Sequence, residues 1–215
     1  MCIIAVSRKG APQPTIEQIK TMFKNNPDGA GYMTVKDKRV IIHKGFMDCK
    51  DFVRAIKSEH FTEADPVVYH FRISTQAGVN PRMTHPFPLT VNPVNCEKLD
   101  LKCSIGLAHN GIIRMTSDFK EKRYSDTAIF ITDYMTRLIR DRKDMRDPAT
   151  IEMIERLTDS KWAIMDDSGE IVTAGHFIES GGILYSNFTY ANVKPISTVY
   201  NFDDYVDGVY GNYKI

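Results

Sequence analysis

Apolar residues recur at helical spacing in several stretches of the chain, and each stretch predicts an amphipathic helix. The expected helices are Thr15–Asn25, Cys49–His60, Asp126–Arg142 and a last one from Pro148 to about Leu157. Thr15 and Ser125 precede two of them and are residue types that cap helix N-termini. The last helix is expected to bury a stripe made of Ile151, Ile154 and Leu157.

Short runs rich in β-branched residues predict strands. The expected strands are Cys2–Ser7, Tyr32–Val35, Val40–Lys44, 66–75, a hairpin over 161–175 that turns at Asp167-Ser168-Gly169, and 182–187. Segment 103–115, CSIGLAHNGIIRM, predicts two short strands joined by a turn at Asn110-Gly111, since this dipeptide suits positive φ angles. The tail after Ser197 carries no clear pattern.

The order of these elements favours one α+β domain. Helices come in pairs and strands come in hairpins, whereas a doubly wound parallel sheet would alternate them strictly. This order predicts largely antiparallel sheets covered by helices. The sequence contains no internal repeat or evident linker, so we expect a single domain over residues 1–215.

Composition narrows the classes of protein to consider. Apolar residues make up 42% of the chain, and 28 basic and 27 acidic side chains leave a formal net charge of +1. This balance indicates neither a nucleic-acid nor a membrane partner. No apolar stretch approaches the roughly 20 residues that span a bilayer. We therefore expect a cytoplasmic protein with reduced cysteines, whose spacing predicts no structural zinc or other metal site.

Cys2 directly follows the initiator methionine and opens the first predicted strand. A thiol nucleophile needs a base, because the thiolate is the attacking form and a free cysteine has a pKa near ~8.5. If Met1 is removed, the α-amine of Cys2 has a pKa near ~7.7–8.0 and can serve as that base. No histidine partner is then required.

Other polar residues where strands end suit the remaining needs of such a site. The Asn110 side-chain amide and the Gly111 backbone N–H are candidate oxyanion donors. Arg72 offers a planar fork for a carboxylate, and Asp126 offers a counter-charge for an ammonium group. Together they would hold a free amino acid.

Each of these residues also has an ordinary structural explanation. Cys2 can be a small strand residue, and Arg72 can be a surface or ion-pair residue. Asn110-Gly111 can be a hairpin turn, and Asp126 can be an early-helix charge favoured by the helix dipole. Structural positions are also expected for His70, His85 and His109.

The order of the polar motifs resembles the class II glutamine amidotransferases, a branch of the N-terminal nucleophile (Ntn) hydrolases. In that family a cysteine follows the initiator methionine, which is cleaved. The resembling segments are NPDGAG at 26–31, HFRIST at 70–75, THPF at 84–87, HNG at 109–111 and SDT at 125–127. Cys2, the HNG motif and the R-x-x-T loop are fairly specific in combination, and SDT is weak alone.

The resemblance implies a role for each matching position. Cys2 would be the nucleophile, with its own α-amine as general base, and Asn110 and Gly111 would form the oxyanion hole. Arg72 would bind the glutamine carboxylate, and Thr75 would help to position it. Asp126 would bind the α-ammonium. The implied fold is a four-layer αββα sandwich. The implied chemistry needs no cofactor: it releases ammonia from the glutamine side chain and hydrolyses a γ-glutamyl thioester.

Two departures from the family pattern concern substrate preference. Asp126 is followed by Thr127-Ala128, without the acidic residue often found there, and QAG at 76–78 replaces a short histidine-glycine. Family members usually carry a synthase domain, so a separate synthase subunit could receive the ammonia. Two alternatives stay open: an Ntn-type hydrolase acting on another amide, and a non-catalytic relative that binds a partner or ligand.

Overall fold

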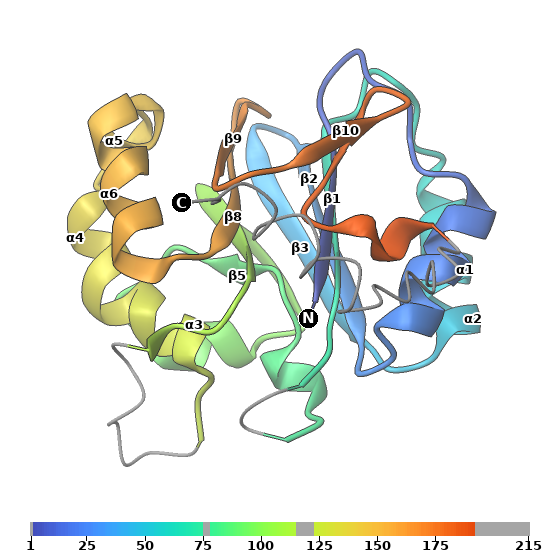
Figure 1. Cartoon of the computed structure of the whole chain (residues 1–215), viewed down its shortest axis with the longest axis horizontal. Helices are drawn as coiled ribbons and strands as arrows, with labels where there is room; N and C mark the ends of the chain where they lie inside the picture. Colours follow the sequence, from blue (N-terminus) through green and yellow to red (C-terminus); the bar gives the residue numbers. More distant parts are fainter. Residues whose placement is uncertain (1, 75–77, 115–122, 192–215) are drawn as a thin grey trace, which may run out of the picture.

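The computed structural model describes residues 2–74, 78–114 and 123–191. Within them the chain forms two sheets with helices on their outer sides (Figure 1). Every strand pair is antiparallel, which confirms the expected α+β class with antiparallel sheets. Among the described residues, no helix combines the length and apolar character needed to cross a bilayer.

The larger sheet has seven strands in the order β10-β11-β1-β4-β2-β3-β6. Their bounds are β1 Ile3–Ser7, β2 Ala30–Lys36, β3 Arg39–Phe46, β4 Val67–Phe71, β6 Asp100–Cys103, β10 Ile178–Ser180 and β11 Ile183–Tyr185. The smaller sheet has four strands in the order β5-β7-β8-β9. Their bounds are β5 Phe87–Pro88, β7 Ile105–Asn110, β8 Lys161–Asp166 and β9 Ile171–Ala174.

Helices α1, Ile16–Asn25, and α2, Cys49–Glu59, cover the outer face of the larger sheet (Figure 1). Thr15 caps α1 through a capping box, as its residue type predicted. The side chain of Asp48 caps α2 by accepting from two backbone N–H groups. Buried apolar side chains of both helices pack on alternate residues of the strands, such as Ile3 and Ala5 of β1.

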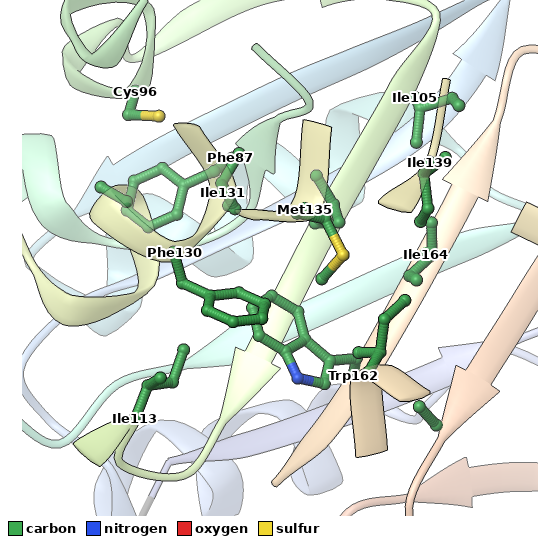
Figure 2. Packing of buried hydrophobic residues seen from close by; sticks show 14 of the residues in the cluster. Phe87, Cys96, Ile105, Ile113, Phe130, Ile131, Met135, Ile139, Trp162 and Ile164 are labelled. Atoms are coloured by element: carbon green, nitrogen blue, oxygen red, sulfur yellow. The ribbon is translucent and has the colours of Figure 1, made fainter. Parts of the chain in front are cut away.

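The outer face of the smaller sheet carries the other helices (Figure 1). They are α3 Asp126–Phe130, the π-helical segment Ile131–Met135, α4 Thr136–Leu138, α5 Arg142–Arg146 and α6 Pro148–Thr158. Figure 2 shows Phe130 and Met135 packed against Trp162 of β8. The opposite faces of the two sheets share a third apolar cluster that includes Ile4, Met33 and Ala163.

The structure corrects the strand prediction for 103–115. Residues 105–110 form the single strand β7, which pairs with β8 and β5, and no strand follows at 112–114. The break lies earlier, at Ser104, where the chain passes from β6 in one sheet to β7 in the other. Asn110-Gly111 is therefore not a hairpin turn, and Gly111 is not among the positive-φ residues.

The structure also shortens the long predicted helix 126–142. Ser125 caps it as expected, but the helical run ends at Leu138. Ile139 is extended, with φ −116° and ψ 103°, and Asp141 caps the separate helix α5. Ile139 is buried at 1% exposure, and the Asp141 side chain accepts from the N–H groups of Lys143 and Asp144, which begins a new helix where the predicted one would have continued.

Two smaller expectations also fail. Strand β4 ends at Phe71 rather than near residue 75. Leu157 of α6 is 39% exposed, although Ile151 and Ile154 do pack on the core. The segment between β4 and β6 contains strand β5, which was not predicted, and two 3₁₀ turns, Pro81–Met83 and Pro93–Glu97.

Candidate active site

One small cavity gathers most of the predicted site residues. Cys2, Arg72, Gly111 and Asp126 all line it, although they come from four separate segments: the start of β1, the end of β4, the end of β7 and the start of α3. Thr75 lies outside the described residues. The other lining residues are Ile73, Met83, His85, His109, Ser125 and Thr127.

The cavity has a volume of about 30 Å³. One water needs roughly 10–15 Å³ on this measure, so the cavity holds about two waters. An amino acid is larger, and its binding requires the lining side chains to move apart.

Cys2 is half-buried just before β1. Its Sγ accepts from the Ile73 backbone N–H at 3.4 Å, and its carbonyl accepts from Asn187 Nδ2 at 2.7 Å. Burial raises the pKa of the Cys2 thiol, while the Ile73 N–H and the Arg72 charge act in the opposite direction. The thiol is therefore protonated at neutral pH and needs a base to become a nucleophile.

Arg72 is positioned by the glycine-containing loop before β2. The Arg72 N–H donates to Gly29 O at 2.8 Å, and the Asp28 N–H donates to Arg72 O at 3.0 Å. Gly29 has φ +113°, and a Cβ there would lie 2.7 Å from Thr84 Cγ2, so this close approach requires glycine. The NPDGAG segment thus fixes the backbone of Arg72.

Arg72 is buried at 5% exposure, and its guanidinium Nη1 donates to Gly78 O at 3.0 Å. Burial lowers its pKa, and the nearby Cys2, Asp28 and Asp126 oppose that change. Because an arginine stays charged even after a moderate shift, the cavity contains a fixed positive charge beside an acidic residue.

Asp126 is half-buried at the first position of α3. Its Oδ2 accepts from the Ile113 N–H at 2.8 Å, and its Oδ1 accepts from the Thr127 N–H at 2.8 Å. These contacts hold the carboxylate at the cavity, and they also hold the segment that follows β7.

Asn110 and Gly111 close the end of β7, but only Gly111 lines the cavity. The Asn110 side chain is 5% exposed, and its Nδ2 contacts Ser186 Oγ at 2.8 Å. Its Oδ1 is buried and has no hydrogen-bond partner among the described residues. The carboxamide is therefore next to β1, with one polar end unused.

Three buried histidines, His70, His85 and His109, lie close together with tilted rings, and His85 and His109 line the cavity. His109 Nδ1 contacts Thr127 Oγ1 at 2.9 Å. Burial lowers the pKa of His109 to about 3 and that of His85 well below its usual range. Both rings are neutral at pH 7 and too weakly basic to take the thiol proton efficiently.

Sequence reasoning missed two residues at this site, Ser186 and Asn187, which it placed only in a predicted strand. They follow β11 and bond to the start of β1. No local pattern marks them, because their partners lie more than 180 positions earlier in the chain.

The described residues contain no group of three or more His, Cys, Asp or Glu side chains arranged to hold a metal ion. In comparisons with known proteins, no family model matches the chain, and no curated protein matches it either. The resemblance to the class II amidotransferases thus depends on the sequence motifs.

Proposed function

We propose that this protein hydrolyses the side-chain amide of glutamine, with Cys2 as the nucleophile. The observation that carries the proposal is that Cys2, Arg72, Gly111 and Asp126 line one cavity despite their distance in sequence. Hydrolysis of the side-chain amide of a free amino acid requires a nucleophile and a backbone donor, together with a cation and an anion that bind the amino acid's own charges.

The reaction starts with removal of Met1, which exposes the α-amine of Cys2. Since the cavity histidines are weak bases, this amine, with a pKa near ~7.7–8.0, takes the thiol proton. Sγ then bonds to the amide carbon, and the C–N bond breaks as the proton passes to the leaving ammonia. Water adds to the γ-glutamyl thioester, which releases glutamate and restores the thiol.

Charge complementarity supports glutamine rather than a neutral amide. Arg72 suits the α-carboxylate because its guanidinium donates two parallel hydrogen bonds. Asp126 suits the α-ammonium, and its carboxylate acts electrostatically on Arg72. The Gly111 N–H, with the Asn110 amide, would receive the oxyanion.

The arrangement of helices and sheets supports the same family resemblance. In this proposal the two antiparallel sheets with helices on their outer sides are the layers of the αββα sandwich expected for an Ntn hydrolase. The ammonia acceptor in this proposal is a separate synthase subunit, and the enzyme acts in the cytoplasm.

Ammonia release from glutamine by the methionine-free protein tests the proposal. We expect the wild type to turn over glutamine. In Cys2→Ala, kcat should fall by about 1000-fold or more, because the nucleophile is removed. Cys49→Ala is the matched control, since Cys49 is also half-buried but lies on α2. A Cys2→Ala variant with full activity would end the proposal.

The substrate comparison separates the two alternatives. Preference for N-acetylglutamine over glutamine would indicate an amidohydrolase of another class, because that substrate lacks the ammonium for Asp126. A protein that keeps Met1 and turns over neither compound would instead be a binding protein.

A further inference from the structure

A second, larger cavity lies beside the edges of the two sheets. It has a volume of about 440 Å³ and is lined by residues of β6, of the segment that includes β5, and of the connection from β6 to β7. Strands β5 and β6 are each the outermost strand of their sheet, so the cavity lies where both sheets end. It shares no lining residue with the cavity that contains Cys2.

The two cavities lie at opposite ends of β7. Ile105, the first residue of this strand, lines the larger cavity, and Gly111, which follows its last residue, lines the Cys2 cavity. A strand rises ~3.4 Å per residue, so Ile105 and Asn110 are roughly 17 Å apart. A small ligand in the larger cavity is therefore out of reach of the Cys2 thiol.

The charged residues of the larger cavity are all basic. Arg39, Lys98, Lys102 and Arg140 line it, and its lining contains no acidic residue of the described chain. We call it the basic pocket. Arg140 pairs with Asp144 at 3.2 Å, whereas the other three cations form no ion pair within residues 2–74, 78–114 and 123–191.

The acidic residues closest in sequence to the lining lysines do not neutralise the basic pocket. Glu97 pairs with Arg123, and Asp100 contacts His43, so both carboxylates have partners outside the lining. The chain as a whole has a formal net charge of only +1. The positive charge of the basic pocket is thus a local feature and not a consequence of a basic protein.

Such a group of cations suits a phosphate. One exposed cation holds an anion weakly, because solvent screens the pair. A phosphate group carries up to about two negative charges and three acceptor oxygens, so it can contact several cations at once. An arginine adds two parallel hydrogen bonds to a phosphate.

The basic pocket also has an apolar wall, which consists of Pro88, Leu89, Leu101 and Ile105. Pro88 and Ile105 are buried, and the two leucines are half-buried. An inorganic anion would leave this wall uncovered. The volume lies within the range of about 300–1,000 Å³ that is typical of pockets for small organic ligands. A long nucleic acid would instead need basic residues spread along a surface.

We propose that the basic pocket binds a small phosphorylated organic molecule of about the size of a nucleoside diphosphate. The cations bind its phosphate groups, and the apolar wall covers part of its organic group. This site is separate from the one at Cys2, and its occupancy does not depend on the proposed reaction there.

Isothermal titration calorimetry of the full chain with ADP tests the proposal. We expect one ADP per chain and weaker binding of pyrophosphate, which has no organic group for the apolar wall. Lys102→Gln and Arg39→Gln should each weaken ADP binding about 10-fold, the order of one lost charge-assisted hydrogen bond. Lys57→Gln is the matched control, because it removes an exposed lysine of α2 outside the basic pocket.

Lysine acetylation, mapped by peptide mass spectrometry, locates the bound ligand. ADP should slow the acetylation of Lys98 and Lys102 and leave that of Lys57 unchanged. Three results would overturn the proposal: no binding of ADP or pyrophosphate at millimolar concentration, equal effects at Lys57 and Lys102 in either experiment, or a single-stranded oligonucleotide that binds more tightly than ADP. The last result would indicate a nucleic-acid surface instead.

Discussion

Gly111 has no room for a side chain, because a Cβ atom there would overlap the Cβ and hydroxyl of Ser160. The sequence predicts glycine at this position for a turn with positive φ, and the structure gives it a different reason. Sequence reasoning identified the residue correctly but not its contact. Ser160 comes much later in the chain, after helices α3 to α6, so no local pattern connects it with Gly111.

Gly111→Ala should therefore lower the free energy of unfolding by about 1–3 kcal/mol, the usual cost of an overpacked site. Urea denaturation measures the loss. Ser160→Gly in the same chain removes the atoms that clash and should restore part of it. If the two substitutions instead lower stability additively, the close contact is not the cause.

At the scale of elements, local chemistry predicted the helix beginnings well and long-range packing decided the rest. Thr15 and Ser125 cap α1 and α3, because a cap needs only its own next few residues. The run 126–142 was predicted as one helix, but the helix ends at Leu138 and Ile139 is extended. Strand β7 was misread because its partners β5 and β8 are remote in sequence.

The cap of α2 gives an element-scale prediction. Asp48 accepts from the backbone N–H groups of Lys50 and Asp51, so Asp48→Ala should lower the free energy of unfolding by about 1 kcal/mol. Asp48→Asn keeps an acceptor and should lose far less. Chemical denaturation compares them with Asp51→Ala, an exposed carboxylate in the same turn, and equal losses at both positions would contradict the capping role.

At the scale of the whole molecule, the fold brings together residues that no local pattern connects. The sequence predicted Cys2, Arg72, Gly111 and Asp126 as one site through the order of their motifs, and one cavity contains them. The contact between Asn110 and Ser186 was beyond that reasoning, because it depends on how the two sheets pack.

The buried histidines predict how stability depends on pH. Burial lowers the pKa of His70 and of His109 to about 3, whereas each titrates near ~6.5 in the unfolded chain. The unfolded state therefore binds more protons below pH ~6.5. The free energy of unfolding should be highest above that pH. It should fall by about 1.4 kcal/mol per pH unit for each histidine as the pH drops further.

Urea denaturation at several pH values between 7 and 5 measures this slope, in a range above the titration of ordinary carboxylates. His109→Gln removes one of these histidines, so it should reduce the slope of unfolding free energy against pH by about 1.4 kcal/mol per pH unit. A free energy of unfolding that is constant across the range would show that these rings titrate in the folded protein as they do in the unfolded chain.

The central claim is that the thiol of Cys2 attacks an amino-acid amide, and trapping it tests that claim most directly. The methionine-free protein is treated with the glutamine analogue 6-diazo-5-oxo-norleucine, and peptide mass spectrometry locates the product. The account predicts one adduct per chain, on Cys2, formed more slowly when excess glutamine competes. No adduct, or one on Cys49, Cys96 or Cys103, would contradict it.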